Sequence, residues 1–203
     1  MCQLLETIKV KQNTLQHLKF HTNRVNYSRS FLFQSVDNWD LSQLIDVPEL
    51  DPDGIYRCRF LYSRVVEKIE FLPYIPRIIQ KLFLVRNETL DYSFKYANRD
   101  AIDRLKSTYA PEQDSDILIV KDGFVTDTSF SNIVFFDGRQ WFTPATPLLK
   151  GTKRAWYLKN RTISERLITP VDLHNYQKAR LLNAMLDLED GEDIRIENIL
   201  SKP

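Results

Sequence analysis

The chain has 203 residues, with 28 lysines and arginines against 27 aspartates and glutamates, and a formal net charge of +1. This balance argues against a nucleic-acid-binding or membrane-surface protein, because both classes usually carry a basic excess. The hydrophobic fraction of 43% and the charged fraction of 27% are ordinary for globular domains, so a sizeable core is expected and disorder is not.

The two cysteines, Cys2 and Cys58, are too few for a disulfide framework and lack the spacing of a metal site. The first ten residues carry polar and acidic side chains where a signal peptide would have an apolar run. Apolar runs such as residues 117–120 are as long as strands and much shorter than membrane spans. We therefore expect a reduced, cytoplasmic protein without a metal, a nucleic-acid partner or a membrane contact.

The first half of the chain is predicted to form a small antiparallel sheet with one long helix. Leu18, His21, Val25 and Ser28 recur on one face of the helix. Around Cys58, apolar residues alternate with arginines, which predicts a strand with one wet face. The expected elements are a helix at 14–33, a turn region at 47–54, and strands at 4–10, 55–63, 65–71 and 77–85.

The second half is predicted to be richer in short strands, with turns at Asp122-Gly123 and Asp137-Gly138. A polar segment at residues 87–92 is the expected linker. It would separate a small N-terminal α+β domain, residues 1–86, from a larger β-rich C-terminal domain, residues 93–203. The expected elements are a helix at 98–109, strands at 116–120, 124–127, 132–136 and 140–143, a helix from about 151, and apolar stretches at 163–169 and 179–188.

Gly151-Thr152 stands at the start of the second of these helices and could bind an anion. Backbone N–H groups at a helix N-terminus lack intrahelical partners, and glycine permits close approach. Lys153 and Arg154 are unfavourable in a first turn without an anion, which favours a phosphate. On spacing alone, an ordinary capped helix with a basic first turn explains the same residues.

Four further residues could carry chemistry, although simpler explanations exist for them. Lys95 lies between Phe94 and Tyr96, and desolvation there would make its neutral amine available; a solvated surface lysine is the alternative. Asp127 ends a predicted strand and could instead be a turn-forming residue. His21 and Arg24 share a helix face, where a histidine is often a packing residue.

The order of these motifs resembles the class IV aminotransferase family, the fold-type IV enzymes that use pyridoxal 5′-phosphate (PLP). The closest similarity in motifs is to aminodeoxychorismate lyase, and the resemblance runs almost end to end. The matching segments are Leu5-Glu6-Thr7-Ile8, His21-Thr22-Asn23-Arg24, Lys95-Tyr96-Ala97-Asn98-Arg99, Asp127 through Asn132-Ile133, Thr143-Pro144 with Leu148 and Gly151-Thr152-Lys153-Arg154, and Asn183-Ala184-Met185.

The resemblance implies an α+β fold whose PLP site lies in the cleft between the two domains, and a homodimer. It implies that Lys95 holds the cofactor as a Schiff base and moves a proton, and that Asp127 pairs with the pyridine nitrogen. The phosphate would lie on Gly151 and Thr152, with Arg24 as a further ligand. Asn183 would line the phosphate region and Ala184 the substrate-carboxylate region.

The resemblance also leaves several functions open, because the sequence departs from the family pattern. Asp127 stands where glutamate is usual, Thr152-Lys153 stands where Ile-Thr is usual, and Asp100 replaces a tyrosine. The implied reaction is lysis of 4-amino-4-deoxychorismate to 4-aminobenzoate and pyruvate for folate biosynthesis. The alternatives are an aminotransferase acting on small branched-chain or D-amino acids and a non-catalytic binding protein.

A substrate carboxylate requires an arginine or a backbone pocket. Arg59 is our expected substrate residue, with Arg57, Arg64 and Arg86 also eligible. The face that each arginine occupies cannot be deduced from the sequence, because a shift of one residue in strand register exchanges the two faces. A solvated strand arginine is the alternative explanation for each of them.

Overall fold

The computed structural model describes residues 2–201 and divides the chain into two compact units. The first unit comprises Met1–Pro76 and Phe94–Asn98, and the second comprises Arg77–Ser93 and Arg99–Pro203. The mixed helix-and-strand composition expected from the sequence is present in both. Each unit is described by itself below.

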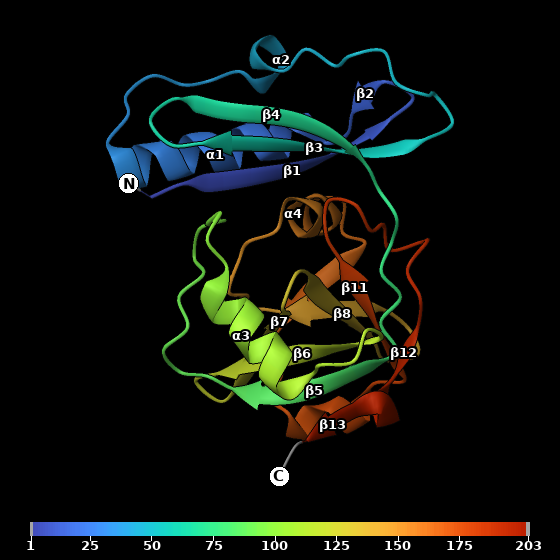
Figure 1. The fold of residues 1–203 in the computed structure, drawn as a ribbon. Coiled ribbons are helices and arrows are strands. Elements are labelled where there is room, and N and C mark those ends of the chain that lie inside the picture. The colour runs from blue at the N-terminus through green and yellow to red at the C-terminus, as the bar shows by residue number, and fades with distance from the viewer. Residues whose placement is uncertain (1, 202–203) are drawn as a thin grey trace. The chain divides into compact units, whose positions relative to one another are not determined.

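The first unit is a four-stranded antiparallel sheet with the order β2-β1-β3-β4 and a long helix packed on one face (Figure 1). Leu4, Ile8 and Phe60 are fully buried on that face, where Val25 of the helix joins the same apolar core. Burying these side chains is the main force that holds the helix to the sheet. The elements are β1 (Leu4–Lys11), β2 (Thr14–Leu15), α1 (Leu18–Phe33), α2 (Leu41–Leu44), β3 (Ile55–Tyr62) and β4 (Val66–Pro73).

The long helix starts four residues later than the sequence pattern predicted. Gln12 and Asn13 have φ angles of 51° and 54°, and Lys11 pairs with Thr14 across them. Positive φ at both positions of a two-residue loop is the geometry that joins antiparallel strands in a hairpin. Strand β2 therefore occupies residues that we expected in the helix, and α1 begins at Leu18.

Strand β5 (Lys81–Arg86) belongs to the second unit, although the expected domain boundary placed it in the first. It pairs in parallel with both β6 (Ser115–Lys121) and β13 (Ile199–Ser201). Its Leu82 is fully buried in the core of the second unit. A central strand needs partners on both edges, and only long-range pairing identifies those partners. The residues expected as a linker, 87–92, also lie in the second unit.

The second unit contains two sheets, with the orders β10-β9-β8-β11-β12 and β13-β5-β6-β7. Helix α3 contacts β6, as Figure 1 shows. The remaining elements are α3 (Asp100–Tyr109), β7 (Phe124–Thr128), β8 (Asn132–Phe136), β9 (Trp141–Pro144), α4 (Thr152–Lys159), β10 (Ile163–Arg166), η1 (Val171–Asn175), β11 (Lys178–Leu182), β12 (Ile194–Arg195) and η2 (Ile196–Asn198).

The predicted turns and strands of the second unit are largely confirmed. Asp122 and Gly123 have φ angles of 51° and 81° and connect β6 to β7, as the Asp-Gly pair predicted. Leu118, Ile133 and Phe135 are fully buried in one apolar core. The apolar stretch at 179–188 is a strand only as far as Leu182. No helix among residues 2–201 is long and apolar enough to cross a membrane.

Candidate active site

Lys95 is held through its backbone at the edge of the first unit's sheet. The Leu5 N–H donates to Lys95 O at 2.9 Å, and the Ala97 N–H donates to Gln3 O at the same distance. Lys95 itself is half-buried, and Phe94 and Tyr96 pack against the apolar core. The flanking aromatic residues therefore anchor the segment, and the lysine, expected to be either desolvated or a solvated surface residue, is half-buried.

Arg24 of helix α1 is bound to Glu6 of strand β1 in the same unit. Arg24 Nε donates to Glu6 Oε1 at 2.7 Å, and Arg24 Nη2 donates to Glu6 Oε2 at 2.6 Å. Burial alone would raise the pKa of Glu6, but Arg24 and the hydrogen bond from His21 outweigh it and lower that pKa to about 2. Glu6 is therefore an ionised carboxylate inside the unit.

His21 completes this buried cluster, with its Nδ1 placed 2.6 Å from Glu6 Oε2. Burial lowers the pKa of His21 despite the opposing hydrogen bond to Glu6, and the charges of Arg24 and Lys95 lower it further. An ionised carboxylate can only accept hydrogen bonds, so Nδ1 of His21 carries a proton and donates a hydrogen bond to Glu6. Lys95 and Arg24 both belong to the first unit, and the charges of both act on His21.

Arg59 lies on the other face of this sheet from Glu6. It pairs in register with Thr7, one residue along from Glu6, and side chains alternate between faces along a strand. Its Nη1 donates to Glu70 Oε2 at 3.1 Å, and 36% of its side chain is exposed. The structure thus separates two arginines that the sequence placed in one site, Arg24 and Arg59. Arg57, Arg64 and Arg86 are all exposed.

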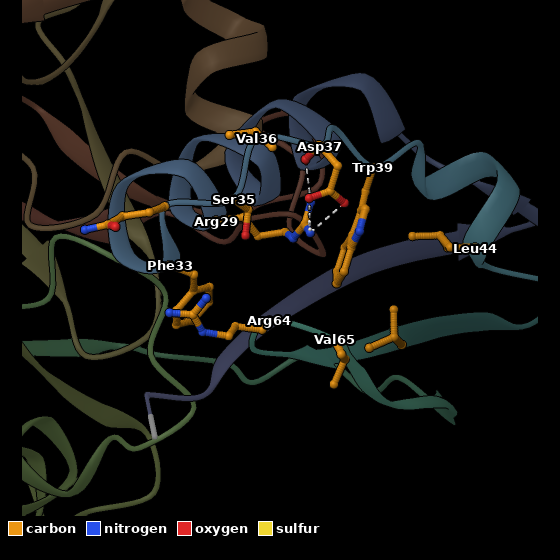
Figure 2. Close-up of a pocket in the computed structure, with 11 residues that line it drawn as sticks. Arg29, Phe33, Ser35, Val36, Asp37, Trp39, Leu44, Arg64 and Val65 are labelled. Carbon is orange, nitrogen blue, oxygen red and sulfur yellow. Dashed lines mark hydrogen bonds and ion pairs between the residues drawn. The ribbon is translucent and has the colours of Figure 1, made fainter.

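A pocket in the first unit is lined by residues of and after helix α1, and Figure 2 shows its polar side. Arg29 Nη2 donates to both carboxylate oxygens of Asp37, at 2.9 and 3.1 Å. The Arg29 guanidinium carbon also lies 3.6 Å from the centre of the Trp39 ring. Arg64 lines this pocket, whereas Lys95 and Arg24 are not among the described residues that line it.

Asp127 lies one residue before the end of strand β7 in the second unit and is a buried acid with defined hydrogen-bond donors. Asn132 Nδ2 donates to Asp127 Oδ1 at 2.7 Å, and the Leu149 N–H donates to Asp127 Oδ2 at 2.9 Å. Burial raises the pKa of Asp127 to about 6, against these hydrogen bonds and the charge of Arg154, which lower it. Asp127 is therefore a buried carboxyl group, and its hydrogen-bond donors come from the loop before α4 as well as from β8.

Gly151 directly precedes helix α4 and is packed against Asn132. A Cβ built on Gly151 would overlap Asn132 Oδ1 and lie 3.1 Å from Asn132 Cγ. The same asparagine donates to Leu149 O at 2.9 Å, so it joins Asp127 to the loop that leads into Gly151 and Thr152. Two expected site residues of the second unit, Asp127 and Gly151, thus share one neighbour. Thr152 begins the helix and is buried.

Lys153 and Arg154 are already paired with carboxylates, which weakens the inference from the sequence that a basic first turn favours a phosphate. Lys153 Nζ contacts Asp187, and Arg154 Nη2 donates to Glu165 Oε1 at 2.6 Å. These acids offset the unfavourable positive charge in the first turn, so a phosphate is not needed to explain the basic pair. Gly151 at the N-terminus of α4 remains as the feature that favours anion binding.

Asn183 organises the turn that follows β11. Its Oδ1 accepts hydrogen bonds from the Met185 and Leu186 N–H groups, at 2.8 and 3.1 Å. Asn183 and Ala184 are both half-buried. The amide of Asn183 thereby fixes the backbone of the segment that we expected to line the phosphate and substrate-carboxylate regions.

Glu6 and Asn132 are the buried side chains that hold Arg24 and Asp127, and neither had an expected role, although both lie inside segments that resemble the family. Glu6 alternates with the apolar Leu4 and Ile8 along one strand, which was the available signal, because charged residues are seldom buried without a partner. Asn132, the first residue of the predicted strand at 132–136, carried a weaker signal.

Comparison with known proteins agrees with the motifs. The family model described as amino-transferase class IV matches residues 3–188. An uncharacterised protein from Haemophilus influenzae is 33% identical over 190 residues, which are 91% of this chain and 98% of that protein. A solved structure of a candidate 4-amino-4-deoxychorismate lyase from Haemophilus somnus 129PT is 31% identical, with a TM-score of 0.85 over 93% of this chain and 98% of that one.

Two more distant structures show the same fold. A candidate amino-acid aminotransferase from Mesorhizobium loti has a TM-score of 0.76 and 20% identity, covering 100% of this chain and 99% of that one. A PLP-bound hypothetical aminotransferase from Mycobacterium tuberculosis has a TM-score of 0.74 and 18% identity, covering 95% and 80%. With the family model spanning nearly the whole chain, this protein belongs to the class IV aminotransferase family.

Proposed function

We propose that this protein is a PLP-dependent lyase that converts 4-amino-4-deoxychorismate to 4-aminobenzoate and pyruvate. The observation that carries the PLP assignment is the buried acid Asp127, which is held by Asn132 and the Leu149 N–H. The substrate assignment is supported by the 31% identity to the protein named as a candidate 4-amino-4-deoxychorismate lyase. The Lys-x-x-Asn-Arg segment at Lys95 and the Asn183-Ala184-Met185 segment support the same reaction.

The residues of the second unit fit the two polar ends of PLP. A protonated pyridine nitrogen needs a carboxylate, and a neighbouring positive charge would lower the pKa of Asp127 below about 6 and keep it ionised at neutral pH. A phosphate needs N–H groups that have no intrahelical partner, which the start of α4 at Gly151 would supply. When bound, PLP supplies an electron sink for negative charge at the substrate Cα.

Lys95 would supply the amine that holds the cofactor and would then move a proton at the substrate Cα. One backbone hydrogen bond joins Lys95 O to Leu5 of β1, and a second joins Ala97 to Gln3, so the segment that carries the amine has a defined position. The neutral amine is the form that reacts with an aldehyde and accepts a proton. Arg24 would contact the phosphate, as its position in the His-x-x-Arg segment suggests.

The cofactor assignment is tested by the visible spectrum of purified protein supplied with PLP. We expect a yellow chromophore, and reduction with borohydride followed by peptide mapping should locate the cofactor on Lys95. The variant Lys95→Ala should lose both signals, whereas Lys121→Ala should keep them, because Lys121 bonds to Leu90 O in another part of the fold. Protein that stays colourless with PLP would support the non-catalytic binding protein instead.

The reaction is tested by supplying substrate with and without a keto-acid acceptor. A lyase forms 4-aminobenzoate and pyruvate from 4-amino-4-deoxychorismate with no acceptor present. The second candidate, an aminotransferase on small branched-chain or D-amino acids, is favoured by the family description and turns over only when a keto acid is added. Turnover that depends strictly on the keto acid would replace the lyase proposal with this one.

A further inference from the structure

Glu6 is a buried carboxylate for which the proposed chemistry has no direct use. Its side chain is fully buried within strand β1, among the apolar residues that face helix α1. An unpaired carboxylate in such a position would be strongly destabilising. Its three donor contacts, two from Arg24 and one from His21, all lie between 2.6 and 2.7 Å.

The contact with Arg24 fixes an orientation as well as a charge. Nε and Nη2 lie along one edge of the planar guanidinium, and each bonds to a different oxygen of Glu6. A two-bond contact of this kind sets the plane of the guanidinium, which a single ion pair does not. His21 Nδ1 donates to Oε2 and so restrains the carboxylate from the helix side.

Stability alone does not account for this arrangement. Well-packed apolar residues at such sites are often as stabilising as a buried ion pair, because removing two charges from water is costly. The Arg24 side chain retains 13% exposure, while Glu6 has none. The Arg24 guanidinium is therefore held in one orientation and stays partly exposed, whereas the Glu6 carboxylate that holds it is buried.

We propose that Glu6 is a positioning residue that orients the Arg24 guanidinium toward the phosphate of the cofactor. The inference rests on the proposed function, since it needs a phosphorylated ligand. It adds a residue with a specific role: Glu6 touches neither the cofactor nor the substrate and acts through Arg24. If Arg24 is misdirected, the affinity should therefore fall only for ligands that carry a phosphate.

The test compares the affinity of the full-length protein for PLP and for pyridoxal, which lacks the phosphate. Wild type should prefer PLP. Glu6→Gln keeps the shape of the side chain but removes its charge, and should weaken PLP binding at least tenfold while pyridoxal binding changes less than twofold. The control Asp37→Asn breaks the Arg29 ion pair at the end of the same helix and should leave both affinities unchanged.

A second comparison isolates the route through Arg24. In an Arg24→Ala background, Glu6→Gln should weaken PLP binding no further, because the residue that it orients is gone. If Glu6→Gln does not fold, Arg24→Lys carries the test: lysine keeps the charge but not the two-bond geometry, and should lose at least tenfold in PLP affinity.

Two results would overturn the inference while leaving the proposed function intact. One is a Glu6→Gln protein that prefers PLP as strongly as wild type does, and the other is an equal loss of affinity for PLP and pyridoxal. A wild-type protein that binds PLP no better than pyridoxal, or binds neither, would overturn the proposed function itself.

Discussion

Asn132 Nδ2 donates a hydrogen bond of 2.7 Å to Asp127 Oδ1, and both side chains are buried in the second unit. The same amide nitrogen donates to Leu149 O, so one side chain connects the buried acid to the loop before α4. The geometry of the proposed pyridine-nitrogen partner and that of the proposed phosphate loop therefore depend on the same asparagine.

Asn132→Ala should lower the free energy of unfolding by about 2–3 kcal/mol, because a buried acceptor on Asp127 and a part-buried acceptor on Leu149 lose their donor. The measurement is urea denaturation without added cofactor. Thr143→Val is the matched control, since it removes a single buried hydrogen bond to Ile133 O and should cost about 1 kcal/mol. Equal losses in the two variants would show that Asn132 has no special role.

Gly151→Ala should destabilise the protein and weaken PLP binding, because the new Cβ would overlap Asn132 Oδ1. Gly191→Ala is the control: its nearest neighbour is the side chain of Arg180 at 3.3 Å, which can move aside. The double variant Gly151→Ala with Asn132→Ala removes the obstruction. Its stability loss, measured by urea denaturation, should be smaller than the sum of the two single losses. Strict additivity would contradict the predicted clash.

Asp127→Asn should reveal a pH dependence of stability that originates from the buried acid. The folded state raises the pKa of Asp127 from 3.8 to about 6, so the folded protein holds this proton more tightly than the unfolded chain does. The acid's contribution to stability is complete well below pH 4 and is lost as the pH rises through 6. The wild-type advantage over Asp127→Asn should therefore fall by roughly 2 kcal/mol between pH 4 and 7.

Urea denaturation of both proteins at several pH values measures this difference. Asp137→Asn provides a control of opposite sign. The N–H groups of Gln140 and Arg139 hold the pKa of Asp137 below its ordinary value, so its contribution to stability should grow with increasing pH. A wild-type advantage over Asp127→Asn that stays constant with pH would contradict the raised pKa.

If the expectation from the sequence holds and the substrate carboxylate reaches the sheet face opposite Glu6, Arg59→Gln should raise the KM for substrate about tenfold and leave kcat unchanged. Arg57→Gln is the matched control, because Arg57 lies two residues earlier on β3 and therefore on the same face of the sheet. It should leave both constants unchanged. An unchanged KM in Arg59→Gln would mean that Arg59 forms a surface ion pair with Glu70 and does not bind the substrate.

Features that depend on neighbouring residues could be predicted from the sequence alone. Asp122-Gly123 predicted a turn because few other residues adopt positive φ at both positions, and the alternation around Cys58 predicted that β3 has one exposed face. The order of the family motifs, from Glu6 to Asn183, identified the family before any fold was known. Where local pattern was ambiguous, as at Thr14, the predicted helix boundary was wrong.

Only the tertiary structure decided how distant residues meet. Strand β5 joins the second unit through pairing with β6 and β13, which local periodicity cannot specify. Arg24 and Glu6 are 18 residues apart, and their two-bond contact exists only because α1 packs on β1. The raised pKa of Asp127 likewise comes from burial by segments far along the chain. Burial and long-range pairing are properties of the whole fold. They therefore determine the contacts and pKa values of residues that the sequence motifs identify but cannot place.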